Sequence, residues 1–336
     1  MNEQNPELPP VETSILPDHK DRSTGLLVFG ILTILLGCMT GLLVLLMLVG
    51  QVAARSTNAP PTPLSAILFA MFIYGILAVA LVWLGIGSIK ARRWARALLL
   101  IFSWSWLVMG VFVLLFMAFF MPKILANINA SATPGQPVMP AAAIGGIMVF
   151  TGLILGVFFI LVPAVWIFFY NSRHVKVTCE TRDSVTRWTD ACPLPVLGLC
   201  LWLLFSAPML LIMPIMGYGV MPFFGTLLTG LPGMLFCLCL AAFWGYCAWL
   251  LYKLDARGWW LILIAMVVFM VSAVLTYARH DVIEMYQLMG YPQAQIEQIQ
   301  KTGLLTGNRM AWMMSFSMLP FLGYIFFIKK YLRGKT

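Results

Sequence analysis

Long apolar runs separated by short polar segments make up most of the chain. Each run has about 20 residues or more, the length that a helix needs to cross the hydrocarbon core of a bilayer. Strands of a transmembrane barrel would instead be about ten residues long, with alternating polarity. The runs predict eight transmembrane helices, at 26–49, 64–89, 98–121, 142–170, 194–216, 231–252, 259–277 and 310–327, with Pro122 ending the third.

The positions of the basic residues give these helices an orientation. Cytosolic loops of membrane proteins are enriched in Lys and Arg. If both ends of the chain are cytosolic, 16 of its 21 basic residues fall in cytosolic segments, and the five others are Arg55, Lys123, Arg279, Lys301 and Arg309. This alternation predicts that the N-terminus and the C-terminus both lie in the cytosol.

The composition supports a membrane location. Hydrophobic residues make up 61% of the chain and charged residues only 10%, whereas a soluble domain has about 25% charged residues. A chain of this size could not hide so much apolar surface in one water-soluble core. We therefore expect an all-α integral membrane protein. Its short loops resemble those of many bacterial multi-pass proteins, so the expected location is a bacterial inner (plasma) membrane.

Two similar segments point to an internal duplication. The letters ARRW at 91–94 follow the second apolar run, and ARGW at 256–259 follow the sixth, 165 residues later. Pro163 in the fourth run and Pro320 in the eighth both precede aromatic residues and then basic ones. These matches predict a tandem 4+4 parallel repeat, whose halves are related by an axis along the membrane normal. The alternative is that basic and aromatic helix ends recur in any membrane protein.

The repeat divides the chain into five predicted segments. The first 24 residues are polar and rich in Pro and Glu, which favours disorder and does not fit a cleaved signal peptide. The linker between the halves is expected either to be a plain tether or to dock on the bundle or a partner. The segments are a disordered cytosolic N-terminal tail at 1–24, a first four-helix half at 25–171, a cytosolic linker at 172–192, a second four-helix half at 193–332 and a cytosolic tail at 333–336.

Two further stretches have unusual sequences. The segment 216–233 is apolar and rich in Gly and Pro, so we expect either a re-entrant or interfacial segment or a short turn between two kinked helices. The loop 280–308 contains a helical pattern ended by Gly290, and a second one that begins after Pro292. It predicts a short helical cap on the outer surface.

Ionisable residues are absent from the apolar runs. All twelve acidic residues and the three histidines lie in tails or loops. An ionisable group that persists within a membrane usually marks an ion or proton path. Its absence argues against a proton-coupled pump, a voltage sensor or an intramembrane protease. The sequence also lacks the nucleotide-binding and hydrolase motifs, so we do not expect an enzyme.

No metal or cofactor site is predicted. His174, Cys179 and Cys192 share one loop with three acidic residues, but their spacing lacks the close ligand pairs typical of zinc sites. The 22 methionines are scattered through apolar runs, where Met is a flexible core filler. The sequence therefore assigns no catalytic, cofactor-binding or metal-binding residue and no cofactor.

The expected partners are lipids and other helices. Basic residues at the ends of apolar runs are placed to meet anionic headgroups, and this placement does not favour nucleic acid. Gly37-x-x-x-Gly41 and Gly152-x-x-x-Gly156 allow close helix packing. We expect contacts within the bundle, with a dimer or protein-partner face as the alternative. Hydroxyl groups that could line a midplane cavity or bond between helices are at Ser103, Ser105, Thr226, Ser272 and Ser315.

Two functions remain open from the sequence. The absence of catalytic motifs and of intramembrane charge favours a non-enzymatic scaffold, accessory or regulatory subunit. The alternative is a transporter or permease for a neutral or lipid-like solute, favoured by the duplication and by the Pro and Gly residues in the fifth and sixth spans.

Overall fold

The computed structural model describes residues 20–56, 64–130, 140–215, 219–301 and 307–332. Over these ranges eight helical segments are long and apolar enough to cross a membrane, which confirms the number predicted. They are α1 (Ser23–Ser56), α2 (Leu64–Ile89), α3 (Arg93–Ala130), a continuous rod of α4 (Ala141–Gly156), the π-helix η1 (Val157–Leu161) and α5 (Val162–Asn171), then α7 (Leu194–Ile215), α8 (Gly230–Tyr252), α9 (Ala256–Tyr277) and α12 (Gly307–Leu332). The chain is a multi-pass integral membrane protein.

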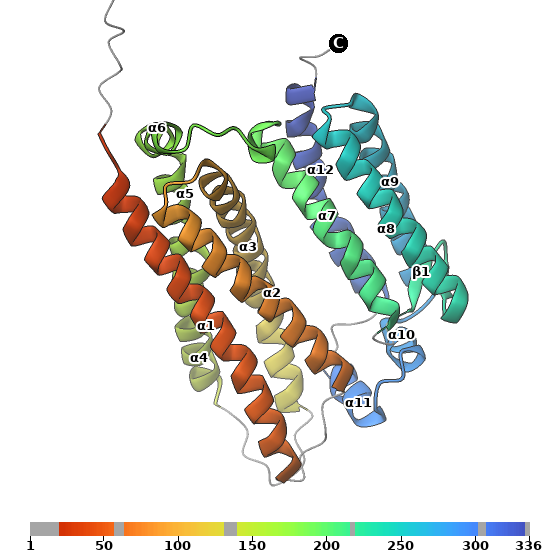
Figure 1. Cartoon of the computed structure of the whole chain (residues 1–336). Coiled ribbons are helices and arrows are strands. Elements are labelled where there is room, and N and C mark those ends of the chain that lie inside the picture. The colour runs from red at the N-terminus through yellow and green to blue at the C-terminus, as the bar shows by residue number, and fades with distance from the viewer. Residues whose placement is uncertain (1–19, 57–63, 131–139, 216–218, 302–306, 333–336) are drawn as a thin grey trace, which may run out of the picture.

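The helices form two groups that lie side by side (Figure 1). The first group holds α1 to α5, and the second holds α7, α8, α9 and α12. In each group the second span packs on the first, the third on the second and the fourth on the third. The groups meet where α3 contacts α7.

The two ends of the molecule differ in character. One end carries the α2–α3 turn, the short helix α6 (Arg173–Arg182) and the α8–α9 turn, and we call it the basic face. The other end, the opposite face, carries strands β1 (Met221–Phe223) and β2 (Thr226–Leu228) and helices α10 (Val282–Leu288) and α11 (Gln293–Lys301). The helices α10 and α11 confirm the cap predicted for the loop 280–308, and α11 also reaches α3.

Proline does not end the third span. Pro122 lies inside α3, which continues to Ala130, so the predicted end at Pro122 is wrong. A proline removes one helical hydrogen bond, whereas ending the helix in lipid would leave several backbone groups unsatisfied. Continuing the helix past Pro122 is therefore the smaller loss.

Proline has a visible effect in the fourth span. The π-helix η1 ends just before Pro163, which lacks the N–H that a regular helix would use there. Gly110 of α3 lies against the carbonyl oxygen of Phe159 in η1, where a Cβ atom would collide. Glycine at position 110 therefore allows α3 to pack directly on the irregular turn.

The two predicted glycine motifs have different surroundings. A Cβ atom at Gly37 would lie 2.9 Å from Val82 Cγ2 and 3.0 Å from the Ala78 carbonyl oxygen, so Gly37 packs α1 closely on α2. A Cβ atom at Gly152 or Gly156 would meet no described atom within 4 Å. The expected contact within the bundle is confirmed for the first motif and is wrong for the second, because α4 turns that side away from the other helices.

The segment between the halves is docked on the first half. Its helix α6 begins directly after α5, and Val175 and Cys179 of α6 are buried in the core of the first group. The side chain of Asp183 is only 1% exposed, and its Oδ1 atom lies 3.3 Å from Arg92 Nη1 and 3.4 Å from Arg187 Nη2. The linker is therefore packed in place and is not a plain tether.

The predicted tails fall largely outside the described residues. Residues 1–19 of the expected N-terminal tail and residues 333–336 of the C-terminal tail lie outside them. In the described remainder of the first tail, the backbone N–H of Arg22 donates to Thr178 Oγ1 of α6 at 3.2 Å.

The segment 216–233 forms a β-hairpin where it is described, with residues 216–218 outside the described ranges. Strands β1 and β2 pair antiparallel around Phe224 and Gly225, whose φ angles are +43° and +88°. Positive φ at both central residues gives a turn whose twist matches a two-residue hairpin. Neither the re-entrant segment nor the simple turn expected from the sequence is correct, because the strands satisfy each other's backbone.

Candidate functional site

The second group of helices encloses a cavity of about 590 Å³. Helices α7, α8, α9 and α12 form its walls, and β1 and α10 close it toward the opposite face. Ligand pockets typically have volumes of about 300–1,000 Å³. The cavity is therefore large enough for a small molecule or part of a lipid chain.

Each wall presents one face of a helix to the cavity. Trp202, Ser206, Leu210 and Met213 of α7 are spaced by three or four residues, as expected for one helical face. The remaining lining residues are Leu203, Val220, Met221, Pro222, Leu240, Trp244, Met266, Phe269, Tyr277, Met285, Tyr286, Met289, Tyr291, Met314, Met318 and Phe321.

The lining is uncharged and rich in soft, flexible groups. Seven of the lining residues are Met and seven are aromatic, and none is Asp, Glu, Lys, Arg or His. Met side chains adapt to irregular shapes, and aromatic rings supply broad apolar contact. An ionised ligand would lose its hydration in such a cavity without gaining a charged partner. The cavity is therefore suited to a neutral, apolar ligand.

A few polar groups could orient such a ligand. Ser206 Oγ donates to the carbonyl oxygen of Leu203 at 2.9 Å and keeps its lone pairs as acceptors. The Tyr277 hydroxyl is occupied only by a long contact of 3.8 Å to Met285 Sδ. Among the described residues, none accepts a hydrogen bond from the Tyr286 hydroxyl. A ligand with one hydroxyl or carbonyl group could use these atoms.

The cover of the cavity is fixed to α9 by hydrogen bonds. The backbone N–H of Phe224 donates to Ser272 Oγ at 2.9 Å, and that of Gly225 donates to Thr276 Oγ1 at 3.0 Å. Pro222 of the same hairpin lines the cavity. The two hydroxyl groups of α9 therefore hold the hairpin over one end of the cavity.

One wall of the cavity borders the first group of helices. Trp202 of α7 is 45% exposed, and its Nε1 donates to Ser105 Oγ of α3 at 2.8 Å. Helices α7 and α12 are joined near the basic face, where the Tyr324 hydroxyl donates to the Pro195 carbonyl oxygen at 2.8 Å. Farther from that face, the cavity lies between these two helices.

The hydroxyl residues singled out from the sequence lie outside the lining. Each donates to a nearby backbone carbonyl oxygen within its own helix or hairpin. The donors and acceptors are Ser103 to Leu99, Ser105 to Ile101, Thr226 to Phe223, Ser272 to Pro222 and Ser315 to Ala311. Ser105 and Ser272 also bond between elements, so their roles are structural.

Sequence reasoning missed the methionines that line the cavity. Met314 and Met318 of α12 are four residues apart, as are Met285 and Met289 around α10. This spacing places each pair on one helical face. In an apolar helix the same pattern fits a core, a lipid-facing surface or a cavity, so the sequence alone could not select one.

The cysteines near the basic face are not arranged as a metal site. Among the described residues, no three His, Cys, Asp or Glu side chains are grouped so that they could hold a metal ion. Burial raises the pKa of the Cys179 thiol to about 11, and it does the same for Cys192. Both thiols are therefore protonated at neutral pH and poorly reactive.

Comparison with known proteins adds no relative, since no protein-family model, curated protein or solved structure matches the chain. Function must then be inferred from the chemistry of the site itself. The uncharged cavity is the feature of the described residues that most resembles a ligand site.

Proposed function

We propose that the protein binds a neutral, lipid-like molecule in the cavity of the second helix group and acts as a transporter or permease for it. The observation that carries this proposal is an uncharged, Met-rich and aromatic-rich cavity of about 590 Å³ within a transmembrane bundle. Its lining offers broad apolar contact and only a few hydroxyl groups. That combination favours a ligand with a long apolar part and one small polar group.

The position of the cavity supports transport. Its lining extends from Trp244 and Phe321 within the spans to Tyr291, beyond α10 at the opposite face. The hairpin that covers it is small and is held by side chains of one helix. A ligand could therefore enter from one side of the membrane after a local movement of this cover, with no charged coupling group in the cavity.

We also propose that the two helix groups are a tandem 4+4 repeat. The α2–α3 and α8–α9 turns have the same hydrogen bonds, with Ala91 N–H donating to the Ser88 carbonyl at 2.8 Å and Leu254 N–H to the Leu251 carbonyl at 2.8 Å. Ala91 and Leu254 both have a positive φ, of +50° and +60°. These turns correspond at an offset of 163 residues, two fewer than the letter match gives. The shared order of helix neighbours adds support.

The orientation in the membrane is part of the proposal. The positive-inside rule places the basic face, with both ends of the chain, in the cytosol. The proposed location is a bacterial inner membrane, and the cavity cover would then lie on the outer side.

A non-enzymatic scaffold or accessory role is the second candidate. The side of α4 that carries Gly152 and Gly156 is open, and Phe150 and Leu153 beside it are exposed. Small residues on a lipid-facing helix allow close approach of a partner helix. This observation favours a partner subunit or a second copy at α4, and both roles could coexist in one protein.

Photolabelling tests the proposed ligand site. The full chain, reconstituted in lipid, would be exposed to a diacylglycerol that carries a diazirine on its acyl chain, and adducts would be mapped by peptide mass spectrometry. We expect adducts on the cavity residues of α10 and α12. Met314→Trp should lower this labelling by about fivefold or more, because overpacking a site costs at least about 1 kcal/mol.

The matched control is Met234→Trp, because Met234 lies on α8, is 48% exposed and does not line the cavity. It should leave the labelling of α10 and α12 unchanged. Labelling that is confined to lipid-facing residues, or that Met314→Trp does not lower, would contradict the proposal.

A further inference from the structure

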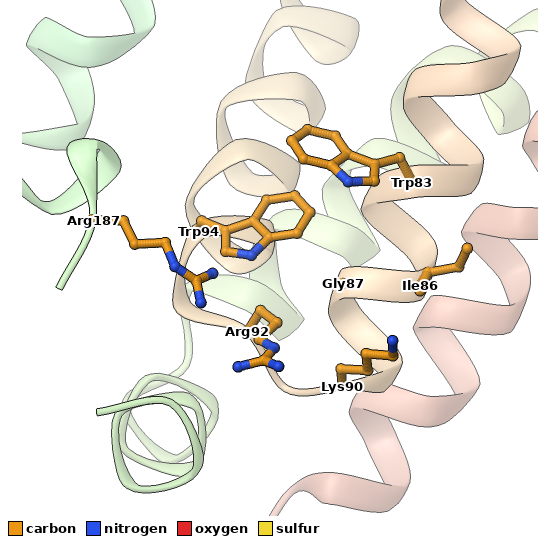
Figure 2. Close-up of a pocket in the computed structure, with 7 residues that line it drawn as sticks. All are labelled: Trp83, Ile86, Gly87, Lys90, Arg92, Trp94 and Arg187. Carbon is orange, nitrogen blue, oxygen red and sulfur yellow. The ribbon is translucent and has the colours of Figure 1, made fainter. Parts of the chain in front are cut away.

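A second pocket, of about 380 Å³, lies at the basic face between α2, α3 and the docked linker. Figure 2 shows its lining, which is Trp83, Ile86, Gly87, Lys90, Arg92, Trp94 and Arg187. It shares no residue with the apolar cavity. Its chemistry is also different, because three of its lining residues are cations and two are tryptophans.

The pocket is built by the close crossing of α2 and α3. A Cβ atom at Gly87 would lie 2.6 Å from Ala95 Cβ and 2.8 Å from the Trp94 ring, so glycine is needed for this approach. The approach brings Trp94 onto Trp83, and the two rings stack with their centroids 4.1 Å apart. The stacked indoles therefore form a rigid apolar wall.

The cations of the pocket are only partly neutralised. Arg92 and Arg187 share one carboxylate, that of the buried Asp183. The neighbouring acids Glu180 and Asp190 lie closest to Arg93, which does not line the pocket. Lys90 has no ion pair among the described residues. The pocket thus has three cations against one carboxylate, a surplus of positive charge.

Asp183 also orients the two arginines. Because their guanidinium groups are held by the same oxygen, their remaining N–H groups are available to a second acceptor. The side chains of Arg92 and Arg187 are 41% and 29% exposed, so a ligand can reach them. Arginine and lysine together are the usual donors to phosphate oxygens.

The tryptophan wall indicates where this phosphate would lie. Trp83 is 53% exposed on the apolar span α2, and Ile86 beside it is 41% exposed, so both face the surrounding lipid. Tryptophan is enriched at the headgroup level of membranes, and basic side chains at span ends reach the same level. The pocket therefore places cations at headgroup depth and apolar surface next to them.

We propose that this pocket binds the phosphate group of an anionic phospholipid. The headgroup phosphate lies among Lys90, Arg92 and Arg187, and the glycerol and upper acyl chain lie along Trp83. The surplus positive charge selects a net anionic headgroup such as phosphatidylglycerol, because it repels the choline cation of phosphatidylcholine. The site is independent of the proposed ligand of the second helix group.

Native mass spectrometry of the full chain tests the site. The protein would be equilibrated with equal amounts of phosphatidylglycerol and phosphatidylcholine, and retained lipids would be counted. We expect the wild type to retain phosphatidylglycerol over phosphatidylcholine by about fivefold or more, since one basic side chain near a membrane surface contributes about that factor. Lys90→Glu should abolish this preference, and Lys90→Gln should reduce it. Neither change breaks an ion pair among the described residues.

The matched control is Lys253→Glu, which makes the same change of charge in the corresponding α8–α9 turn, where Lys253 lies 4.0 Å over the Trp249 ring. It should keep the preference. Competition with millimolar inorganic phosphate distinguishes the sources: displacement of the lipid means that phosphate alone is sufficient, and resistance means that the lipid chain is also bound. Equal retention of the two lipids by the wild type, or an equal loss in Lys90→Glu and Lys253→Glu, would overturn the proposal.

Discussion

Replacement of Asp183 by Ala is expected to destabilise the protein by about 3 kcal/mol and to release the linker from α3. The carboxylate is almost completely buried, pairs with Arg92 and Arg187, and accepts the backbone N–H of Arg93 at 3.3 Å. Without it, two positive charges face each other at the edge of the bundle. The loss falls at the low end for a buried pair because both guanidinium groups keep contact with water.

Thiol alkylation measures the release of the linker. Cys179 of α6 is 1% exposed, and burial raises its pKa to about 11, so it should react slowly with a maleimide at pH 8 in the wild type. Asp183→Ala should accelerate this reaction strongly and lower the melting temperature. Asp21→Ala is the control, because Asp21 pairs with Arg182 of the same linker but at an exposed position. Equal reactivity of Cys179 in the wild type and in Asp183→Ala would show that Asp183 does not hold the linker.

Removal of the two hydroxyl groups that hold the hairpin should have the second largest effect. In the double variant Ser272→Ala and Thr276→Val, the backbone N–H groups of Phe224 and Gly225 lose their acceptors. Each unsatisfied buried group costs about 1–3 kcal/mol. The hairpin should therefore separate from α9, and a bound ligand should leave the cavity faster.

Hydrogen–deuterium exchange of the hairpin amides provides the measurement. The double variant should lose the protection of residues 221–228 while α7 and α8 keep theirs. Ser315→Ala is a suitable control, because its hydroxyl donates only to the Ala311 carbonyl oxygen of the same helix. If the hairpin stays protected in the double variant, the strands are held by contacts other than these hydroxyl groups.

The transmembrane helices could be predicted because span length and charge placement depend on residues close together in the sequence. The apolar runs give eight spans, and the α10–α11 cap follows from Gly290 and Pro292. The end of α3 could not be found from Pro122, since the cost of exposing backbone to lipid exceeds the cost of one missing hydrogen bond.

Features that depend on pairing across the chain were beyond the sequence. The hairpin at 221–228 has the apolar composition of a membrane segment, and its acceptors Ser272 and Thr276 lie about 50 residues away. The docking of the linker depends on Asp183 meeting Arg92, which is 91 residues distant. The cavity likewise depends on which face of α12 turns toward α7, and Met314 gives no sign of that in sequence.

The most direct test of the central proposal is a cryo-electron microscopy map of the full chain in nanodiscs made with its native lipids. The account predicts eight spans and an elongated, unbranched density between α7, α8, α9 and α12, in contact with Met314 and near the hydroxyl groups of Ser206 or Tyr286. A cavity that has collapsed, with Met314 and Met318 packed against α7 and no density between the helices, would contradict it.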